Sequence, residues 1–184
     1  MGQPSELKPD VATVLFVYGE TMLAVQNFER ALATLVIILG RSRRTRELKT
    51  PEAVARALER ELNRSIHGYQ RASAAELRNK LPHDFDPELL PEIERMITWR
   101  DRLAHNYLLE KLVLAGGPTF FQPGTAAELM EVGIGFQVLV QTLSDRVNAA
   151  VAELPSAGAP DAFHELVRSL ARPVKFGEPW KPPN

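Results

Sequence analysis

Apolar residues recur at three- and four-residue spacing along the first part of the chain. They are Val11, Val14, Leu15, Tyr18, Met22, Val25, Phe28, Leu32, Leu35 and Leu39. An α-helix has about 3.6 residues per turn, so this spacing places them all on one side of a single helix. The pattern predicts one long amphipathic helix, with Pro9 in its first turn and Gly40 as its C-terminal cap.

Start and stop signals delimit two shorter helices after it. Residues 50–52 (Thr-Pro-Glu) combine an N-cap, a first-turn proline and a first-turn acid, which predicts a helix to about Ser65. Ser73 and Glu76 have the spacing of a capping box, in which each side chain binds the other residue's backbone N–H. They predict a short helix that ends before Pro82.

The second half of the chain contains two long helical segments. Residues 83–91 hold two prolines and two aspartates, which predicts a turn. The segment Glu92–Ala115 has no internal glycine or proline and predicts a continuous helix. Thr125 and Glu128 form a second capping-box pair and predict a helix to Leu154.

No alternating strand pattern and no fixed-period repeat occurs in the chain. Long helices with short connections indicate an all-α fold, an antiparallel bundle of four or five helices. We expect one bundle domain over residues 1–154, followed in 155–184 by a linker, a short helix and a proline-rich tail.

Composition and charge restrict the possible partners. The formal net charge is −1, so no global positive field draws this chain to nucleic acid, and any RNA contact must be local. One dense basic cluster could supply such a contact, or could simply be a solvated helix end. It consists of Arg41, Arg43, Arg44, Arg46 and Lys49. The absence of cysteine excludes disulfides and thiolate chemistry.

The chain shows no sequence signal for a membrane or for export. Residues 1–10 lack the apolar core of a signal peptide. The most hydrophobic run, Ala31–Leu39, is well short of the roughly 20 residues that span a bilayer. We therefore expect a cytoplasmic protein without a membrane partner.

Arg100 is the most unusual residue of the segment 92–115. On a helix it falls in the middle of an apolar face that includes Ile93 and Met96. Such a position is costly unless an anion or a hydrogen-bond partner meets the guanidinium there. The partner is either an external anion or an acid of the same chain, such as Glu94 or Glu59.

Two polar residues accompany Arg100. Asp101 and His105 are four residues apart, so the carboxylate can orient and charge the imidazole, which could then act as acid or base. Arg100 and His105 are separated by about 140° on an ideal helix. They can meet around one phosphate only if the helix distorts or a second subunit contributes.

The pattern of Arg100, Asp101, His105 and Tyr107 resembles the Arg-polar-x(3,4)-His motif of HEPN domains, and the trailing tyrosine resembles the HepT-like toxin branch. This resemblance implies a helical homodimer with the motifs facing the two-fold axis, and metal-independent RNA cleavage in the members that are enzymes. It also implies roles for individual residues. Arg100 would bind the scissile phosphate, His105 would transfer a proton, Asp101 would support them, and Tyr107 would be modified with AMP by a partner nucleotidyltransferase.

Other interpretations of these residues stay open. Tyr107 lies on the apolar face, where packing is the commoner role of an aromatic residue. His67, His83 and His164 lack metal-ligand spacing, so we expect no metal and no cofactor. Two functions follow: an endoribonuclease of HEPN type, as a toxin, antiphage or stress component, or a non-catalytic HEPN-like helical dimer that binds a protein or a nucleotide.

Overall fold

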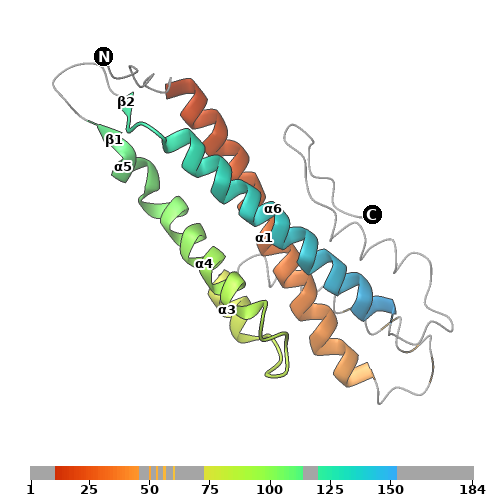
Figure 1. The fold of residues 1–184 in the computed structure, drawn as a ribbon. Coiled ribbons are helices and arrows are strands. Elements are labelled where there is room, and N and C mark those ends of the chain that lie inside the picture. The colour runs from red at the N-terminus through yellow and green to blue at the C-terminus, as the bar shows by residue number, and fades with distance from the viewer. Residues whose placement is uncertain are drawn as a thin grey trace.

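The structure is a computed structural model, and most of the residues it describes are helical, which confirms the all-α class. Three long helices dominate it, namely α1 (Val11–Thr45), α4 (Leu90–His105) and α6 (Thr125–Ala152) (Figure 1). Two shorter helices are α3 (Ala74–Asn79) and α5 (Tyr107–Lys111). The residues described are 11–45, with side chains to 40, and 50, 53, 56, 60, 73–113 and 120–152.

Helices α1 and α6 lie side by side and run in the same direction (Figure 1). The Thr21 hydroxyl of α1 lies 3.0 Å from the Leu129 carbonyl of α6. Two turns further along α1, the ring of Phe28 packs against Phe136, with centroids 5.5 Å apart. Residue numbers therefore rise together along both helices, which is the signature of a parallel pair.

Helix α4 runs against both of them. Tyr18, near the start of α1, donates a hydrogen bond to the carbonyl of Leu103, near the end of α4. Further along α1, Glu29 pairs with Arg100. Residue numbers in these contacts rise along α1 while they fall along α4, so the two helices are antiparallel. Helix α4 therefore returns the chain to the end of the molecule where α6 begins.

The predicted continuous helix over 92–115 is wrong at its C-terminal end. Helix α4 stops at His105, because Asn106 leaves the helical conformation with φ −131° and ψ −22°. Helix α5 follows and ends at Lys111, where the chain becomes extended. Neither glycine nor proline marks this interruption, so the sequence pattern did not reveal it.

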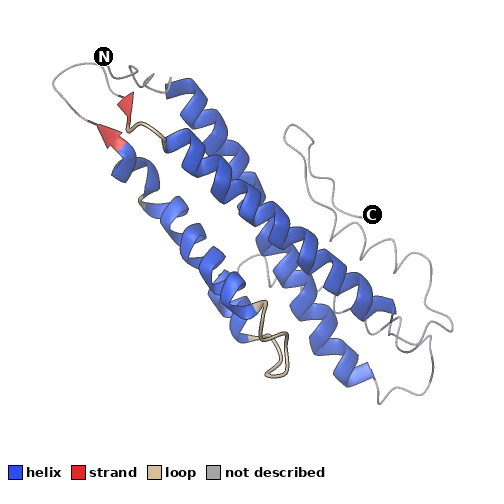
Figure 2. Ribbon diagram, viewed as in Figure 1, coloured by secondary structure: helices blue, strands red, loops and turns tan. Residues whose placement is uncertain are grey.

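Two very short strands were also not predicted. Strand β1 (Leu112–Val113) pairs antiparallel with β2 (Phe120–Phe121), and the two lie at one end of the molecule (Figure 2). Gln122 continues the pairing by donating its backbone N–H to the Lys111 carbonyl at 2.9 Å. Strands of two residues are too short to show alternation.

The predicted helix start at Thr125 is confirmed, because α6 begins there, and two further predicted starts are confirmed with their caps. The N–H of Ala53 donates to the Thr50 hydroxyl at 3.3 Å, and residues 53, 56 and 60 are helical. The capping box of Ser73 and Glu76 is present in both directions. The turn predicted over 83–91 is likewise present, and it leads into α4 with a proline in the first turn.

Two other predicted caps are wrong. Helix α1 continues through Gly40 to Thr45. The Thr125 hydroxyl donates to the Gln122 carbonyl at 2.6 Å, and the Glu128 N–H bonds to the Gly124 carbonyl at 2.9 Å, so no capping box forms. Instead, α6 follows Gly124, whose φ of 80° favours glycine.

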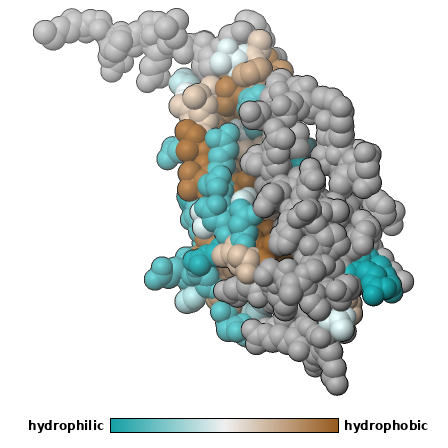
Figure 3. All heavy atoms as spheres, turned by 90° about the vertical axis from the view of Figure 1, so that its right-hand side faces the viewer, coloured by the Kyte–Doolittle hydropathy of each residue, from teal (hydrophilic) through white to brown (hydrophobic). Residues whose placement is uncertain are grey.

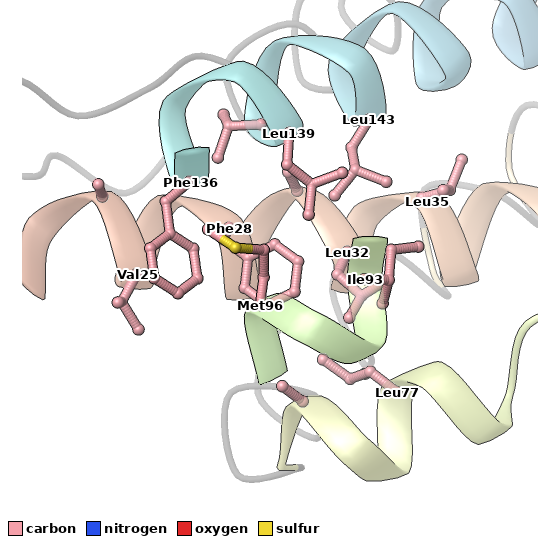
Figure 4. Close-up of a cluster of buried hydrophobic side chains, with 14 of the residues drawn as sticks. Val25, Phe28, Leu32, Leu35, Leu77, Ile93, Met96, Phe136, Leu139 and Leu143 are labelled. Carbon is pink, nitrogen blue, oxygen red and sulfur yellow. The ribbon is translucent and has the colours of Figure 1, made fainter. Parts of the chain in front are cut away.

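The core lies where α1, α4 and α6 meet, with α3 below α4 (Figure 4). Two glycines let the long helices approach closely. A Cβ atom at Gly133 would lie 3.3 Å from the Thr21 hydroxyl oxygen, and one at Gly135 would lie 3.1 Å from the Met96 methyl carbon. Gly133 therefore faces α1 and Gly135 faces α4.

The stretch Val11–Gly40 of α1 is long and apolar enough to cross a membrane by length and composition alone. It is much longer than the run that sequence inspection singled out, because few charges interrupt the preceding turns. In the structure, 61% of its apolar window is buried inside the protein. This burial is typical of the core helix of a globular bundle.

Several predictions lie outside the described residues. They concern the basic side chains over 41–49, the end of the helix that starts at Thr50, and the linker, short helix and tail in 155–184.

Candidate functional site

Arg100 does have the anionic partner that its position required, but the acid is Glu29 of α1. Its Nε donates to Glu29 Oε1 at 2.7 Å, and its Nη1 donates to Asp101 Oδ1 at 3.0 Å. The side chain is 27% exposed. Burial lowers the pKa of Arg100, and the hydrogen bonds to Glu29 and Asp101 outweigh that effect, so the net shift is upward.

The structure describes only one of the two acids considered as partners from the sequence, and that acid pairs with another arginine. Glu94 pairs with Arg78 of α3, and Glu59 lies outside the described residues. Glu29 could not be identified from local spacing because it is 71 residues from Arg100 in the chain. Only the antiparallel packing of α4 on α1 brings the two together.

His105 lies at the last position of α4, and its side chain is exposed. Asp101, one turn earlier, is also exposed, but its carboxylate accepts the hydrogen bond from Arg100. Within the described part of the chain, no hydrogen bond or ion pair joins Asp101 to His105. The structure thus brings Arg100 and Asp101 together and leaves the imidazole available to solvent.

Tyr107 is fully buried, on the far side of the helix break. Its hydroxyl donates to the backbone carbonyl of Thr125 at 3.3 Å. Burial raises the pKa of the Tyr107 hydroxyl far above its ordinary value, and the nearby carboxylate of Glu128 raises it further. Modification of this hydroxyl would require the side chain to leave the core.

A charged cluster beside Tyr107 was missed from the sequence. Arg102 pairs with Glu110 at 2.8 Å, and Lys111 pairs with Glu128 at 2.5 Å. The guanidinium of Arg102 also lies over the Trp99 ring, 4.9 Å from its centroid. This stacking was foreseeable, because residues three apart are neighbours on a helix.

The ion pairs of this cluster could not be foreseen in the same way. Glu110 approaches Arg102 only because the helix breaks between them, and Glu128 belongs to a different helix. Arg102 and Lys111 balance Glu110 and Glu128 in formal charge, so this cluster gives the surface no net attraction for an anion.

Among the described residues, no group of three histidine, aspartate or glutamate side chains is placed to hold a metal ion. A comparison with protein-family models, one with curated proteins and one with solved structures each found no match.

Proposed function

We propose that this protein is a cytoplasmic, metal-independent endoribonuclease of HEPN type, in which Arg100 and His105 act on one RNA phosphodiester. One observation carries the proposal. Arg100 is held in a fixed orientation by Glu29 and Asp101 while its Nη2 has no partner among the described residues, and His105 is exposed at the end of the same helix.

The chemistry assigned to each group follows from its type. A guanidinium has five N–H donors, and the two carboxylates use only part of them. The remaining donors can bind a phosphate oxygen and stabilise the charge that develops when the ribose 2′-hydroxyl attacks phosphorus. The imidazole of His105 can accept the proton of that hydroxyl, or donate one to the departing 5′-oxygen.

The two groups would come from different copies of the chain. On one straight helix they diverge by about 140°, and α4 stays helical from Arg100 to His105. A two-fold axis beside this part of α4 would place Arg100 of one copy near His105 of the other. The same proposal includes a toxin, antiphage or stress function and an antitoxin or nucleotidyltransferase as a partner.

The test is RNA cleavage by the full chain in EDTA, compared with Arg100→Ala and His105→Ala. Each substitution should lower the rate by about a hundredfold or more. Arg95→Ala is the matched control, because Arg95 is an exposed arginine of the same helix that pairs with Glu92. An unmodified chain that cleaves no RNA, or equal rates for all four proteins, would refute the enzymatic proposal.

A second candidate is a non-catalytic helical dimer that binds a protein or a nucleotide. The observation in its favour is that the two carboxylates more than neutralise Arg100, so a phosphate must compete with them. It predicts a stable complex with a partner and no RNA turnover. RNA cleavage that depends on Arg100 would exclude it.

A further inference from the structure

Helix α1 is bonded to the end of α4 that carries His105. The hydroxyl of Tyr18 donates a hydrogen bond to the backbone carbonyl of Leu103 at 2.9 Å, across 85 residues of sequence. The contact lies on the side of the molecule that carries α4. That side faces away from the viewer in Figure 3, and the surface shown there mixes hydrophilic and hydrophobic side chains among the described residues. His105 is the last residue of α4, so the bond from Tyr18 holds the turn to which His105 belongs.

The Leu103 carbonyl lies in the turn of α4 where carbonyl groups lose their helical partners. A helix leaves its last four carbonyl groups without an intrahelical donor. The N–H of Asn106 still bonds to the Arg102 carbonyl at 3.0 Å, but Asn106 itself has left the helical conformation. Tyr18 therefore satisfies the next carbonyl from another helix.

The chain beyond the helix break is held from a different side. Tyr107 is fully buried, and its hydroxyl donates to the Thr125 carbonyl near the start of α6. His105 thus lies between two anchored points, one bonded to α1 and the other to α6. Its own side chain is exposed and makes no hydrogen bond to another described residue. The position of the imidazole therefore depends on how firmly the backbone of this turn is held.

Helix α1 also fixes Arg100, the other residue of the candidate site. Glu29 of α1 accepts a hydrogen bond from its Nε at 2.7 Å. Tyr18 and Glu29 belong to the same continuous helix. One rigid element therefore holds both the guanidinium and the turn that carries the imidazole.

We propose that Tyr18 is a positioning residue for His105, whose hydroxyl fixes the last turn of α4 and with it the place where the imidazole meets RNA. This role rests on the ribonuclease function proposed above. Tyr18 acts through the Leu103 backbone and needs no contact with RNA. Displacing a reacting group by about 1 Å can slow an enzyme about a hundredfold, so a loosened turn is sufficient to impair the proton transfer.

The test variant is Tyr18→Phe, which removes one oxygen atom and keeps the ring. The kcat for RNA cleavage in EDTA should fall by about tenfold or more, while KM should change by less than about twofold, because the hydroxyl affects proton transfer and not RNA binding. Thr21→Val is the matched control. It removes another hydroxyl of α1, which bonds to the Leu129 carbonyl of α6 at 3.0 Å, and it should leave kcat unchanged.

Backbone amide hydrogen exchange of the RNA-free chain measures the same turn without catalysis. Tyr18→Phe should speed exchange over residues 103–107 by about fivefold, the effect of losing one hydrogen bond in a local opening, and Thr21→Val should not. Unchanged exchange in Tyr18→Phe, or an unchanged kcat despite faster exchange, would overturn the positioning role. An unaltered chain that cleaves no RNA would overturn the ribonuclease function, and the catalytic role of Tyr18 with it, even if exchange shows that the hydroxyl holds the turn.

Discussion

The contact between Phe28 of α1 and Phe136 of α6 gives a direct test of the parallel helix pair. Both rings are fully buried, and their centroids lie 5.5 Å apart at an interplanar angle of 54°. Replacing either ring by alanine would cost about 3–5 kcal/mol, a large part of the roughly 5–15 kcal/mol that stabilises a typical domain. Leucine is therefore the better replacement, because it keeps most of the volume and lets the variants fold.

We expect Phe28→Leu and Phe136→Leu to be non-additive. Contacting aromatic rings contribute about 0.5–1.5 kcal/mol beyond their buried area, and either single substitution already removes this contribution. The free energy of unfolding of both single variants and the double variant, from urea titrations, gives the coupling. Phe28→Leu combined with Phe85→Leu is the control, since Phe85 is buried without a ring contact to Phe28.

The outcome distinguishes this helix register from any other. Residues that do not touch are usually additive to within about 0.3–0.5 kcal/mol. A coupling below that range for Phe28 and Phe136, or an equal coupling in the control pair, would show that the rings are not in contact. The parallel arrangement of α1 and α6 would then be wrong.

Four further predictions concern single polar groups. Thr21→Val should lower the free energy of unfolding by about 1 kcal/mol in urea titrations, because it removes a buried hydroxyl that bonds to α6. Glu29→Gln should lower it by about 1–2 kcal/mol, since Arg100 loses a half-buried ionic partner. Hydrogen bonds from Ser73 hold the pKa of Glu76 below its ordinary value. The unaltered chain should therefore have a higher free energy of unfolding than Glu76→Gln near neutral pH, and this difference should disappear as the pH falls through the folded-state pKa. For Tyr107 the pKa is raised in the folded state, so the pH dependence runs the other way. Only the unfolded state ionises just above about pH 10, and the free energy of unfolding should therefore fall as the pH rises through that range. Tyr107→Phe should show a weaker fall in the same titration.

Local signals predicted the helices well where local interactions decide them. The apolar spacing from Val11 onward predicted α1, and the Ser73–Glu76 capping box predicted the start of α3. Gly40 failed as a stop signal. A glycine inside a helix costs only about 1 kcal/mol, which does not by itself end a helix whose preceding turn, at Leu39, packs against the core.

The break at Asn106 could not be predicted because distant contacts surround it. On one side, the Leu103 carbonyl accepts a hydrogen bond from Tyr18 of α1. On the other side, Tyr107 is buried and donates to the Thr125 carbonyl near the start of α6. A straight helix fixes the angle between successive residues. The chain makes both contacts with Asn106 outside the helical conformation.

The candidate site, like the fold, could be predicted from the sequence only in part. Physical reasoning from the sequence required a partner for Arg100, and the structure supplies one. Its identity depended on the packing of α4 against α1, which no local pattern encodes. For Tyr107, burial against α6 favours the packing role over modification.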